Sequence, residues 1–238
     1  MKKNLNILIT GGSRGIGNAI ATTVSHRAKN LLLTSQHLDS MLLGLEKIQK
    51  VYNGPIFHFN LDQSNAPSAA DALAEWANSI VDSIDVLVLC AGNYFEGSLM
   101  EISDQEFLNT LNTNFISNYY IVKRLYPLLK RGHSTKVIII GSTAAYAPYE
   151  IPTYSIAKYA LRGFAANLRQ EFIPDNIGVT FISPGGTLTD MWSGVDLAPN
   201  RLLMPSDIAK TIDMLLDLSN QAVVEELIVR PMLGDYNE

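Results

Sequence analysis

Short apolar segments with few charges alternate along the chain with longer segments of helical spacing. The apolar runs are residues 5–10, 30–35, 55–60, 84–90, 136–141, 177–183 and 226–229. Buried parallel strands have this continuous apolar character because helices cover both faces of their sheet. Helical spacing is found over residues 18–28, 40–51, 67–81, 101–130, 152–172 and 206–218. The alternation predicts an α/β fold with a doubly wound parallel sheet between two helical layers.

The pattern continues without a break along the chain. Single α/β domains commonly reach the length of this chain, 238 residues, and no linker rich in Pro, Gly or Ser interrupts the alternation. We therefore expect one domain over residues 1–238. The least patterned stretch, residues 187–203, contains Gly194 and Pro199 and precedes a helix start at Pro205. This stretch is predicted to form a lid-like substrate loop.

The charge balance excludes some classes of partner. There are 18 Lys and Arg against 23 Asp and Glu, which disfavours nucleic acid and anionic membrane surfaces, because both bind through their phosphates. The single cysteine, Cys90, excludes an intrachain disulfide, and no apolar run reaches the roughly 18 residues that cross a bilayer. Asn6 interrupts the apolar stretch where a signal peptide would continue. We therefore expect a cytoplasmic protein without a membrane or nucleic-acid partner.

The histidines do not indicate a metal site. His26, His37, His58 and His133 are far apart in the sequence. They have no ligand spacing with Cys90 or with carboxylates. No metal is expected.

A glycine-rich segment stands between the first predicted strand and the first predicted helix. It reads Thr10-Gly11-Gly12-Ser13-Arg14-Gly15-Ile16-Gly17 and departs from the spacing Gly-x-Gly-x-x-Gly. Glycines here allow a tight turn and a close approach to a pyrophosphate, which the helix N-terminus then stabilises. A plain turn is the alternative for a glycine cluster taken alone. Its position after the first strand favours a nucleotide site made by Gly11, Ser13, Arg14, Gly15, Ile16 and Gly17.

The end of the second predicted strand indicates which nucleotide binds. An acid there would bind the ribose hydroxyls of NAD(H) and repel a 2′-phosphate, but Ser35 and Gln36 occupy the turn. Arg14 supplies a cation for the phosphate, although a solvated side chain is the alternative. The turn therefore favours a dinucleotide that carries a 2′-phosphate. Asp62, after the third strand, is a candidate contact to the adenine end or a helix N-cap.

Pairs with the spacing Tyr-x-x-x-Lys occur three times in the predicted helices, and residues four apart on a helix share one face. The pairs are Tyr119 with Lys123, Tyr126 with Lys130, and Tyr154 with Lys158. The spacing alone is weak, so context must choose. Only the third pair follows a strand that ends in Gly141-Ser142-Thr143. That context places Ser142 and Tyr154 at the carboxyl edge of the sheet, where ligands bind.

Several motifs stand in one order across nearly the whole chain. They are Thr10-Gly11-x-x-x-Gly15-x-Gly17, Asn114, Ser142, Tyr154-x-x-x-Lys158 and Pro184-Gly185. This set resembles the classical short-chain dehydrogenase/reductase family. The resemblance implies a Rossmann fold of strand order 3-2-1-4-5-6-7, a nicotinamide cofactor, and a catalytic tetrad of Asn114, Ser142, Tyr154 and Lys158.

The resemblance also implies a role for each of these residues. Tyr154 would be the general acid or base, Ser142 would hold the substrate oxygen, and Lys158 would bind the nicotinamide ribose. Asn114 would anchor a water that relays protons. Further cofactor contacts are implied for Ala91, Gly92, Tyr154, Lys158, Pro184, Gly185 and Thr187, the last three residues lying against the carboxamide of nicotinamide.

One motif departs from the family pattern. Where the family usually has Asn-Asn-Ala-Gly after the fourth strand, this chain has Leu89-Cys90-Ala91-Gly92. The side-chain hydrogen bonds of both asparagines are therefore absent. We expect somewhat weaker cofactor binding or altered strand packing, and no change of reaction. Cys90 is expected to be a buried packing residue rather than a reactive thiol.

Electrostatics favours a lysine beside a catalytic tyrosine. A free tyrosine has a pKa of about 10, too high for efficient proton exchange near neutrality. An ammonium about 4 Å away, at an effective dielectric constant of 20, would stabilise the phenolate by roughly 4 kcal/mol. Because burial of the phenolate opposes this effect, the value is an upper bound. We therefore expect Lys158 to lower the pKa of Tyr154.

The sequence predicts an oxidoreductase that transfers hydride from NADP(H) to a small or medium apolar ketone, with Tyr154 as proton donor. The alternatives are an NAD-linked alcohol dehydrogenase, a 3-oxoacyl-carrier-protein reductase, and a non-catalytic nucleotide sensor on the same fold. An apolar substrate site is suggested by the apolar residues of the predicted lid together with Tyr94, Phe95, Tyr146 and Tyr149. The family resemblance also implies a homodimer or homotetramer assembled through residues 112–130 and 152–172.

Overall fold

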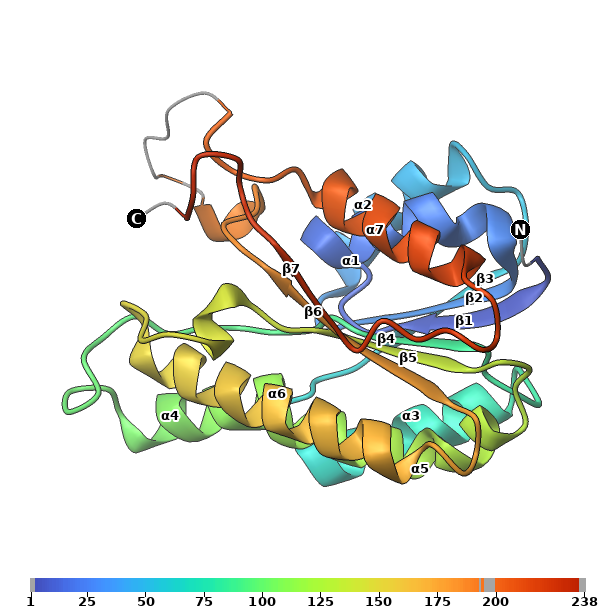
Figure 1. The fold of residues 1–238 in the computed structure, drawn as a ribbon, viewed down its shortest axis with the longest axis horizontal. Coiled ribbons are helices and arrows are strands. Elements are labelled where there is room, and N and C mark those ends of the chain that lie inside the picture. Colours follow the sequence, from blue (N-terminus) through green and yellow to red (C-terminus); the bar gives the residue numbers. More distant parts are fainter. Residues whose placement is uncertain (1–2, 193, 195–199, 236–238) are drawn as a thin grey trace.

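A seven-stranded sheet runs through the centre of the molecule (Figure 1). The computed structural model describes residues 3–192, 194 and 200–235. The strands are β1 (Leu5–Ile9), β2 (Ala28–Ser35), β3 (Ile56–Asn60), β4 (Val86–Leu89), β5 (Lys136–Ile140), β6 (Gly178–Pro184) and β7 (Glu226–Val229). Their order is β3-β2-β1-β4-β5-β6-β7, and all six pairings are parallel. The predicted doubly wound sheet and its strand order are confirmed.

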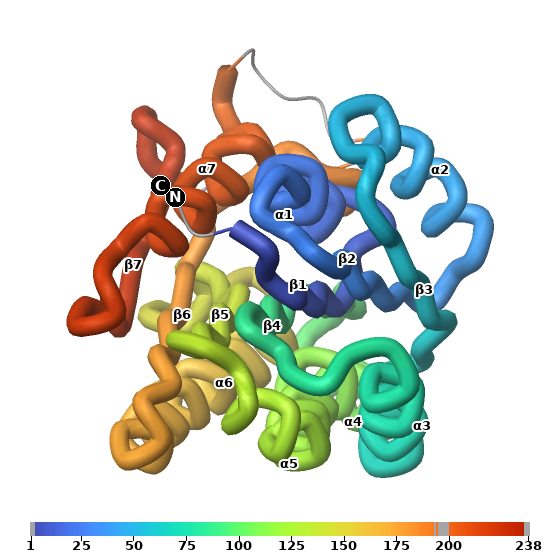
Figure 2. The backbone as a smooth tube through the Cα atoms, turned by 90° about the vertical axis from the view of Figure 1, so that its right-hand side faces the viewer, coloured from blue at the N-terminus to red at the C-terminus, as the bar shows by residue number. Residues whose placement is uncertain are grey.

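Helices cover both faces of the sheet, as the end view in Figure 2 shows. One layer contains α1 (Gly15–Val24), α2 (Leu38–Gln49) and α7 (Pro205–Asp217). The opposite layer contains α3 (Ala66–Asn78), α4 (Asp104–Leu111), α5 (Ser117–Lys130) and α6 (Pro152–Glu171). Two hydrophobic cores result, one beneath each layer.

The strands are apolar along their whole length because successive side chains enter different cores. In β5, Val137 and Ile139 pack towards α3, α5 and α6, whereas Ile138 and Ile140 pack towards α1, α2 and α7. All five residues of this strand are buried. This arrangement explains the continuous apolar runs in the sequence.

All predicted helices differ by at least one residue at their ends, and two differ most from the structure. The helix expected over residues 18–28 begins at Gly15 and ends at Val24. A 3₁₀ turn, Ser25–Arg27, follows, and Ala28 already belongs to β2. The helix expected over residues 101–130 is divided into α4 and α5 by a π-helical turn, Asn112–Ile116.

Within residues 3–192, 194 and 200–235, no helix is long and apolar enough to cross a membrane. In the same part of the chain, no group of three or more His, Cys, Asp or Glu side chains is arranged to hold a metal ion.

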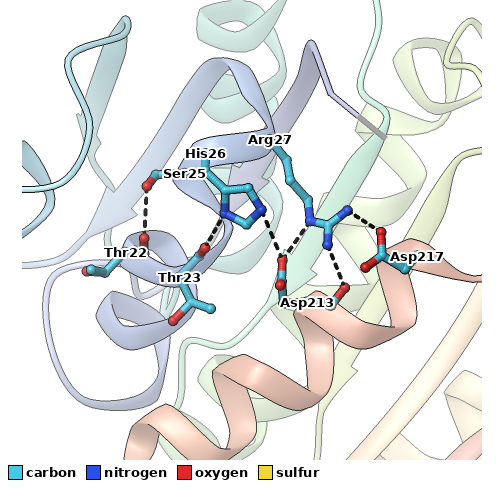
Figure 3. Close-up of polar contacts among 7 residues, drawn as sticks. All are labelled: Thr22, Thr23, Ser25, His26, Arg27, Asp213 and Asp217. Atoms are coloured by element: carbon cyan, nitrogen blue, oxygen red, sulfur yellow. Dashed lines mark hydrogen bonds and ion pairs between the residues drawn. The ribbon is translucent and has the colours of Figure 1, made fainter. Parts of the chain in front are cut away.

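A buried arginine joins the end of α1 to α7 (Figure 3). The Arg27 side chain has no exposed surface, and its Nε donates to Asp213 Oδ1 at 2.6 Å. Its Nη1 donates to Asp217 Oδ1 at 2.8 Å, and its Nη2 to the backbone oxygen of Asp213 at 3.2 Å. His26 Nε2 lies 3.7 Å from the same Asp213 oxygen. All three of these acceptors belong to α7. The hydrogen bonds therefore fix the 3₁₀ turn that carries Arg27 against that helix.

Replacement of Arg27 by methionine is expected to lower the free energy of unfolding by about 3 kcal/mol, because the variant loses the hydrogen bonds of the buried guanidinium, two of which join charged groups. Urea unfolding at pH 7 measures this change. Replacement of Arg124 by methionine, which breaks the more exposed pair with Asp71, should change stability far less. Equal losses for the two variants would contradict the assignment of a structural role to Arg27.

The same network has a predictable pH dependence. Hydrogen bonding to Arg27 lowers the pKa of Asp217 below its ordinary value of 3.8. Its stabilising contribution is therefore fully present above about pH 4 and is lost as the pH falls through the lowered pKa. The stability difference between the wild type and the Arg27→Met variant should shrink in the same acidic range.

Candidate active site

The glycine-rich turn between β1 and α1 has no room for side chains at two of its glycines. Gly11 has a φ of +67°, and a Cβ atom there would lie 2.9 Å from the Ala91 Cα. A Cβ at Gly17 would lie 2.1 Å from the carbonyl oxygen of Gly11. These positions require glycine sterically. The first turn of α1, with Gly15, Ile16 and Gly17, has backbone N–H groups without a carbonyl four residues earlier in the helix.

The end of β1 is bonded to the end of β4. Thr10 Oγ1 accepts hydrogen bonds from the backbone nitrogens of Cys90 at 3.0 Å and Ala91 at 3.2 Å. The chain therefore keeps this connection without asparagine at positions 89 and 90. Leu89 is instead buried in the core. Burial also raises the pKa of Cys90 to about 12, which agrees with a packing role rather than a reactive thiol.

Arg14, in the glycine-rich turn, forms an ion pair with Asp190. Its Nη1 lies 3.1 Å from Asp190 Oδ2, and both side chains are more than half exposed. Asp190 belongs to the 3₁₀ turn Asp190–Trp192 that follows β6. Thr189 approaches the same turn, because its Cγ2 would lie 3.2 Å from a Cβ at Gly15. Ser13 is buried, and its backbone oxygen contacts α2 beside Gly44.

The side chains predicted to meet the adenosine end stand at the ends of β2 and β3. Ser35 is buried and donates to the backbone oxygen of His37 at 2.9 Å, whereas Gln36 is exposed. Asp62 is exposed, and its Oδ1 accepts from the nitrogen of Ser64 at 3.0 Å. The N-cap position of α3 is Asn65, so the alternative of Asp62 as a helix N-cap is wrong.

Ser142, Tyr154 and Lys158 come together at the carboxyl end of β5. Ser142 follows the strand and caps the 3₁₀ turn Thr143–Ala145, accepting from the Ala144 nitrogen at 3.1 Å. Its side chain also forms a hydrogen bond with Tyr154 from the first turn of α6. Lys158, one turn later, is buried and donates from Nζ to the Ile140 oxygen at 3.2 Å. Its Nζ lies 5.2 Å from the centre of the Tyr154 ring.

Burial dominates the electrostatics of this group. It raises the pKa of Tyr154 to about 12, although the hydrogen bond with Ser142 lowers it. Burial also lowers the pKa of Lys158 to about 8. The expectation that Lys158 lowers the pKa of Tyr154 is therefore wrong for the protein without ligands. The physical reason is that the ammonium is itself desolvated and lies over the ring, so it does not offset the desolvation of the phenolate.

Asn114 occupies the π-helical turn between α4 and α5. It has no exposed surface, and its Nδ2 donates to the Asn93 oxygen at 2.7 Å and to the Thr110 oxygen at 3.0 Å. Its Oδ1 is also buried, and no group within the described residues donates a hydrogen bond to it. A Cβ at Gly92 would lie 2.8 Å from this Oδ1 and 3.8 Å from Lys158 Nζ. Asn114 and Lys158 thus face the same space beside Gly92.

The other two Tyr-x-x-x-Lys pairs have contacts that differ from those of the third. Lys123 Nζ donates to the Tyr119 hydroxyl at 3.4 Å, and the pair is exposed. Tyr126 is hydrogen-bonded to Asp175, and Lys130 Nζ lies 2.9 Å from the same carboxylate. Neither pair is joined to a serine at a strand end. Of the three pairs, the one predicted from its sequence context is the one that lies beside Ser142 at the end of β5.

The turn after β6 is contacted by the C-terminal part of the chain. Pro184 ends the strand, and Thr187 Oγ1 donates to the Gly185 oxygen at 2.9 Å. The Gly186 nitrogen donates to Asp235 Oδ1 at 3.2 Å, and a Cβ at Gly185 would lie 2.1 Å from that oxygen. Sequence reasoning missed Asp235, because no local motif connects it to a turn some 50 residues earlier.

The predicted lid is held together at its two ends. Thr187 and Leu203 form an isolated parallel bridge, and the Leu188 nitrogen donates to the Leu203 oxygen at 2.8 Å. The Tyr94 hydroxyl donates to the Met191 oxygen at 3.3 Å, from the loop that follows β4. Within the predicted lid, residue 193 and residues 195–199, with Val195, Leu197 and Pro199, lie outside the described residues.

Two of the predicted aromatic residues have different surroundings. The Tyr149 ring lies 6.3 Å from that of Tyr154. Tyr146 instead donates to Glu226 Oε2 at 3.2 Å and packs beneath the Arg162 guanidinium, 4.2 Å from its ring centre. The hydroxyl of Tyr146 is therefore directed towards β7, and this side chain does not line the site as expected.

Comparison with known proteins gives a consistent result. A model of the short chain dehydrogenase family matches residues 5–199. A sepiapterin reductase of Chlorobaculum tepidum is 30% identical over 98% of both chains. Among solved structures, an alcohol dehydrogenase of Thermococcus sibiricus complexed with 5-hydroxy-NADP has a TM-score of 0.87 and 25% identity, covering 98% of this chain and 97% of the other. The L-sorbose reductase of Gluconobacter frateurii complexed with NADPH and L-sorbose also has a TM-score of 0.87 and 25% identity, over 97% and 96%.

Proposed function

The chain belongs to the short-chain dehydrogenase family, and we propose that it reduces a small or medium apolar ketone to a secondary alcohol with NADPH. The observation that carries this proposal is the group of Ser142, Tyr154 and Lys158 at the carboxyl end of β5. Sepiapterin reductase and L-sorbose reductase are both named as reductases, which supports the direction of the reaction.

The residues at the strand ends fit a dinucleotide. The sterically required glycines at positions 11 and 17 leave the backbone of the turn open to a pyrophosphate, and the first turn of α1 supplies N–H donors. Ser35, Gln36 and Asp62 would meet the adenosine end. Contacts nearer the nicotinamide would come from Ala91, Gly92, Pro184, Gly185 and Thr187. NADP or NADPH in the complexes of similar structures supports this cofactor.

The chain's own residues donate the proton of the reaction and replace it afterwards. NADPH, when bound, supplies the hydride to the carbonyl carbon. Ser142 and Tyr154 hold the carbonyl oxygen by hydrogen bonds, and the Tyr154 proton passes to that oxygen to form the alcohol. With a pKa near 12, Tyr154 is protonated at neutral pH, as a proton donor must be. Its phenolate then regains a proton from solvent through Lys158 and a water held by Asn114.

The test is the loss of NADPH absorbance with purified protein and a panel of ketones, diketones, sepiapterin and 3-oxoacyl thioesters. Turnover of free apolar ketones is expected. Tight NADPH binding without any turnover would instead favour a nucleotide sensor. Much faster turnover of thioesters on an acyl carrier protein would contradict the free-ketone proposal.

An acidic carrier protein would need basic residues near the site, but Lys130 and Arg131 have partners within this chain. Lys130 Nζ lies 2.9 Å from Asp175 Oδ1, and Arg131 Nε donates to the Asp82 oxygen at 2.6 Å. Both residues lie at the end of α5 that precedes β5, whereas the catalytic group follows β5. They are therefore poorly placed to guide a carrier to the site.

The cofactor preference depends on Arg14. A charge-assisted hydrogen bond to a 2′-phosphate is worth about 1.5 to 3 kcal/mol, more than the exposed pair with Asp190 contributes. We therefore expect NADPH to bind more tightly than NADH. Replacement of Arg14 by alanine should weaken NADPH binding about tenfold or more and leave NADH binding nearly unchanged. Fluorescence titration with both reduced cofactors measures this.

Asp190→Asn provides the matched control, because it frees Arg14 without removing it. This variant should bind NADPH at least as tightly as the wild type. Equal dissociation constants of the wild type for NADPH and NADH, or a preference for NADH, would contradict the assignment. A weakening of NADPH binding by Asp190→Asn would assign the contact to the pair rather than to Arg14.

We expect a homodimer or homotetramer assembled through residues 112–130 and 152–172. Tyr119 on α5 and Ile156 and Tyr159 on α6 are large side chains with exposed surface, as an interface between neighbouring helices requires. Light scattering at micromolar concentration should give a multiple of 26.2 kDa. A mass equal to that of one chain would contradict the assembly.

A further inference from the structure

The orientation of the Asn114 amide is fixed by the acceptors around its nitrogen. Nδ2 donates to the Asn93 oxygen at 2.7 Å, to Asn93 Oδ1 at 3.0 Å and to the Thr110 oxygen at 3.0 Å. A rotated amide would place Oδ1 against these three oxygens, which is strongly unfavourable in a buried site. Oδ1 must therefore point the other way, into the space beside Gly92 that it shares with Lys158 Nζ.

Asn93 contributes two of the three acceptors, and its own side chain is fixed by α4. Asn93 Nδ2 donates to Asn109 Oδ1 at 2.7 Å, and Thr113 Oγ1 donates to the same oxygen at 3.3 Å. This contact determines which end of the Asn93 amide faces Asn114. It also holds the loop after β4, and with it the Asn93 carbonyl, against α4, which leads into the π-helical turn that carries Asn114.

The geometry points to Asn93 and Asn109 as positioning residues that direct the Asn114 Oδ1 towards Lys158. The inference deepens the proposed function, on which its kinetic part rests. In that function Asn114 holds the water through which the Tyr154 phenolate regains its proton. A misdirected Oδ1 would slow this return of the proton without removing any group that contacts NADPH or the ketone.

Asn109 allows a matched pair of variants, because it uses only its Oδ1 in these contacts. Asn109→Asp keeps an acceptor for both Asn93 and Thr113, whereas Asn109→Leu removes it at similar volume. Asn93→Ala breaks the contact from the other side. Asn78→Ala, at an exposed amide that bonds to the Ala74 oxygen, is the control outside the site.

The first measurement is independent of turnover. Solvent exchange of the Asn114 side-chain amide protons is followed by NMR, with the resonance assigned from an Asn114→Asp variant. Asn93→Ala and Asn109→Leu should speed this exchange about tenfold or more, because the first removes the Oδ1 acceptor and the second releases the side chain that carries it. Asn109→Asp and Asn78→Ala should exchange like the wild type. Unchanged exchange in both Asn93→Ala and Asn109→Leu would overturn the inference.

The second measurement is ketone reduction in H₂O and D₂O. Asn93→Ala and Asn109→Leu should lower kcat about tenfold and increase its solvent isotope effect, with the NADPH dissociation constant within about twofold of wild type. Asn109→Asp, which keeps the acceptor, should have a kcat and a solvent isotope effect like those of the wild type. A kcat and an isotope effect like those of the wild type, or a parallel loss of NADPH affinity, would overturn the inference. A wild type that reduces no ketone would refute the proposed function, and the exchange measurement would still decide the positioning role.

Discussion

Replacement of Tyr154 by phenylalanine is expected to lower ketone reduction about 10³-fold. The variant loses the hydroxyl that bonds to Ser142 and donates the proton, but it keeps the ring beneath Lys158 Nζ. The fold and the glycine-rich turn should therefore be unaffected. Stopped-flow loss of NADPH absorbance measures the rate, and NADPH fluorescence should give a dissociation constant within about threefold of wild type.

Tyr119→Phe is the matched control for this prediction. Tyr119 has the same spacing to a lysine, and its hydroxyl accepts a hydrogen bond from that lysine, Lys123, at 3.4 Å. It is exposed on α5 and lacks a serine partner at a strand end. Its loss should leave kcat within about twofold of wild type. Retained turnover in Tyr154→Phe, or a comparable loss in Tyr119→Phe, would contradict the catalytic assignment.

The two tyrosines show why the sequence could predict much of the site. A strand, a turn with Ser142, and a helix with Tyr154 and Lys158 are local features with fixed spacing. The parallel sheet then places the ends of β1, β4 and β5 next to one another. Periodicity therefore predicts both the fold and the edge at which these residues meet.

Other features depend on contacts that no local pattern records. The 3₁₀ turn that follows the first helix carries Arg27, and its guanidinium pairs with α7, about 190 residues later. The π-helical turn that places Asn114 lies within a single predicted stretch of helical spacing, residues 101–130. Asp235 reaches the turn after β6 from the end of the described chain. The contacts of Arg27 and Asp235 join segments far apart in the sequence, and the π-helical turn has no signal of its own in the helical spacing.

The pKa of Tyr154 illustrates a further limit. The sequence places a lysine one helical turn away, but it does not give the degree of burial of either group. In the structure, burial raises the pKa of Tyr154 and lowers that of Lys158 to about 8. A lysine that is itself desolvated holds its proton weakly, so the group that changes charge near physiological pH is Lys158 rather than Tyr154.

Replacement of Lys158 by methionine is therefore expected to reduce both turnover and cofactor affinity. The ammonium is proposed to bind the nicotinamide ribose and to return the proton to Tyr154. Without it, kcat should fall about 10²- to 10³-fold and the NADPH dissociation constant should rise about tenfold or more. Methionine keeps most of the buried volume, and thermal unfolding should verify that the variant is folded. Lys123→Met, in the exposed pair, should leave both quantities near wild type.

The pH dependence distinguishes this role from a purely structural one. Because the charged form of Lys158 is the one that donates, kcat/KM of the wild type for NADPH should decrease as the pH rises through about 8. Tyr154, with a pKa near 12, remains protonated over this range and cannot cause the decrease. The residual activity of Lys158→Met should not show this decrease of kcat/KM with pH. A variant that keeps the same decrease near pH 8, or that binds NADPH as tightly as the wild type, would show that another group titrates there and that Lys158 does not hold the cofactor.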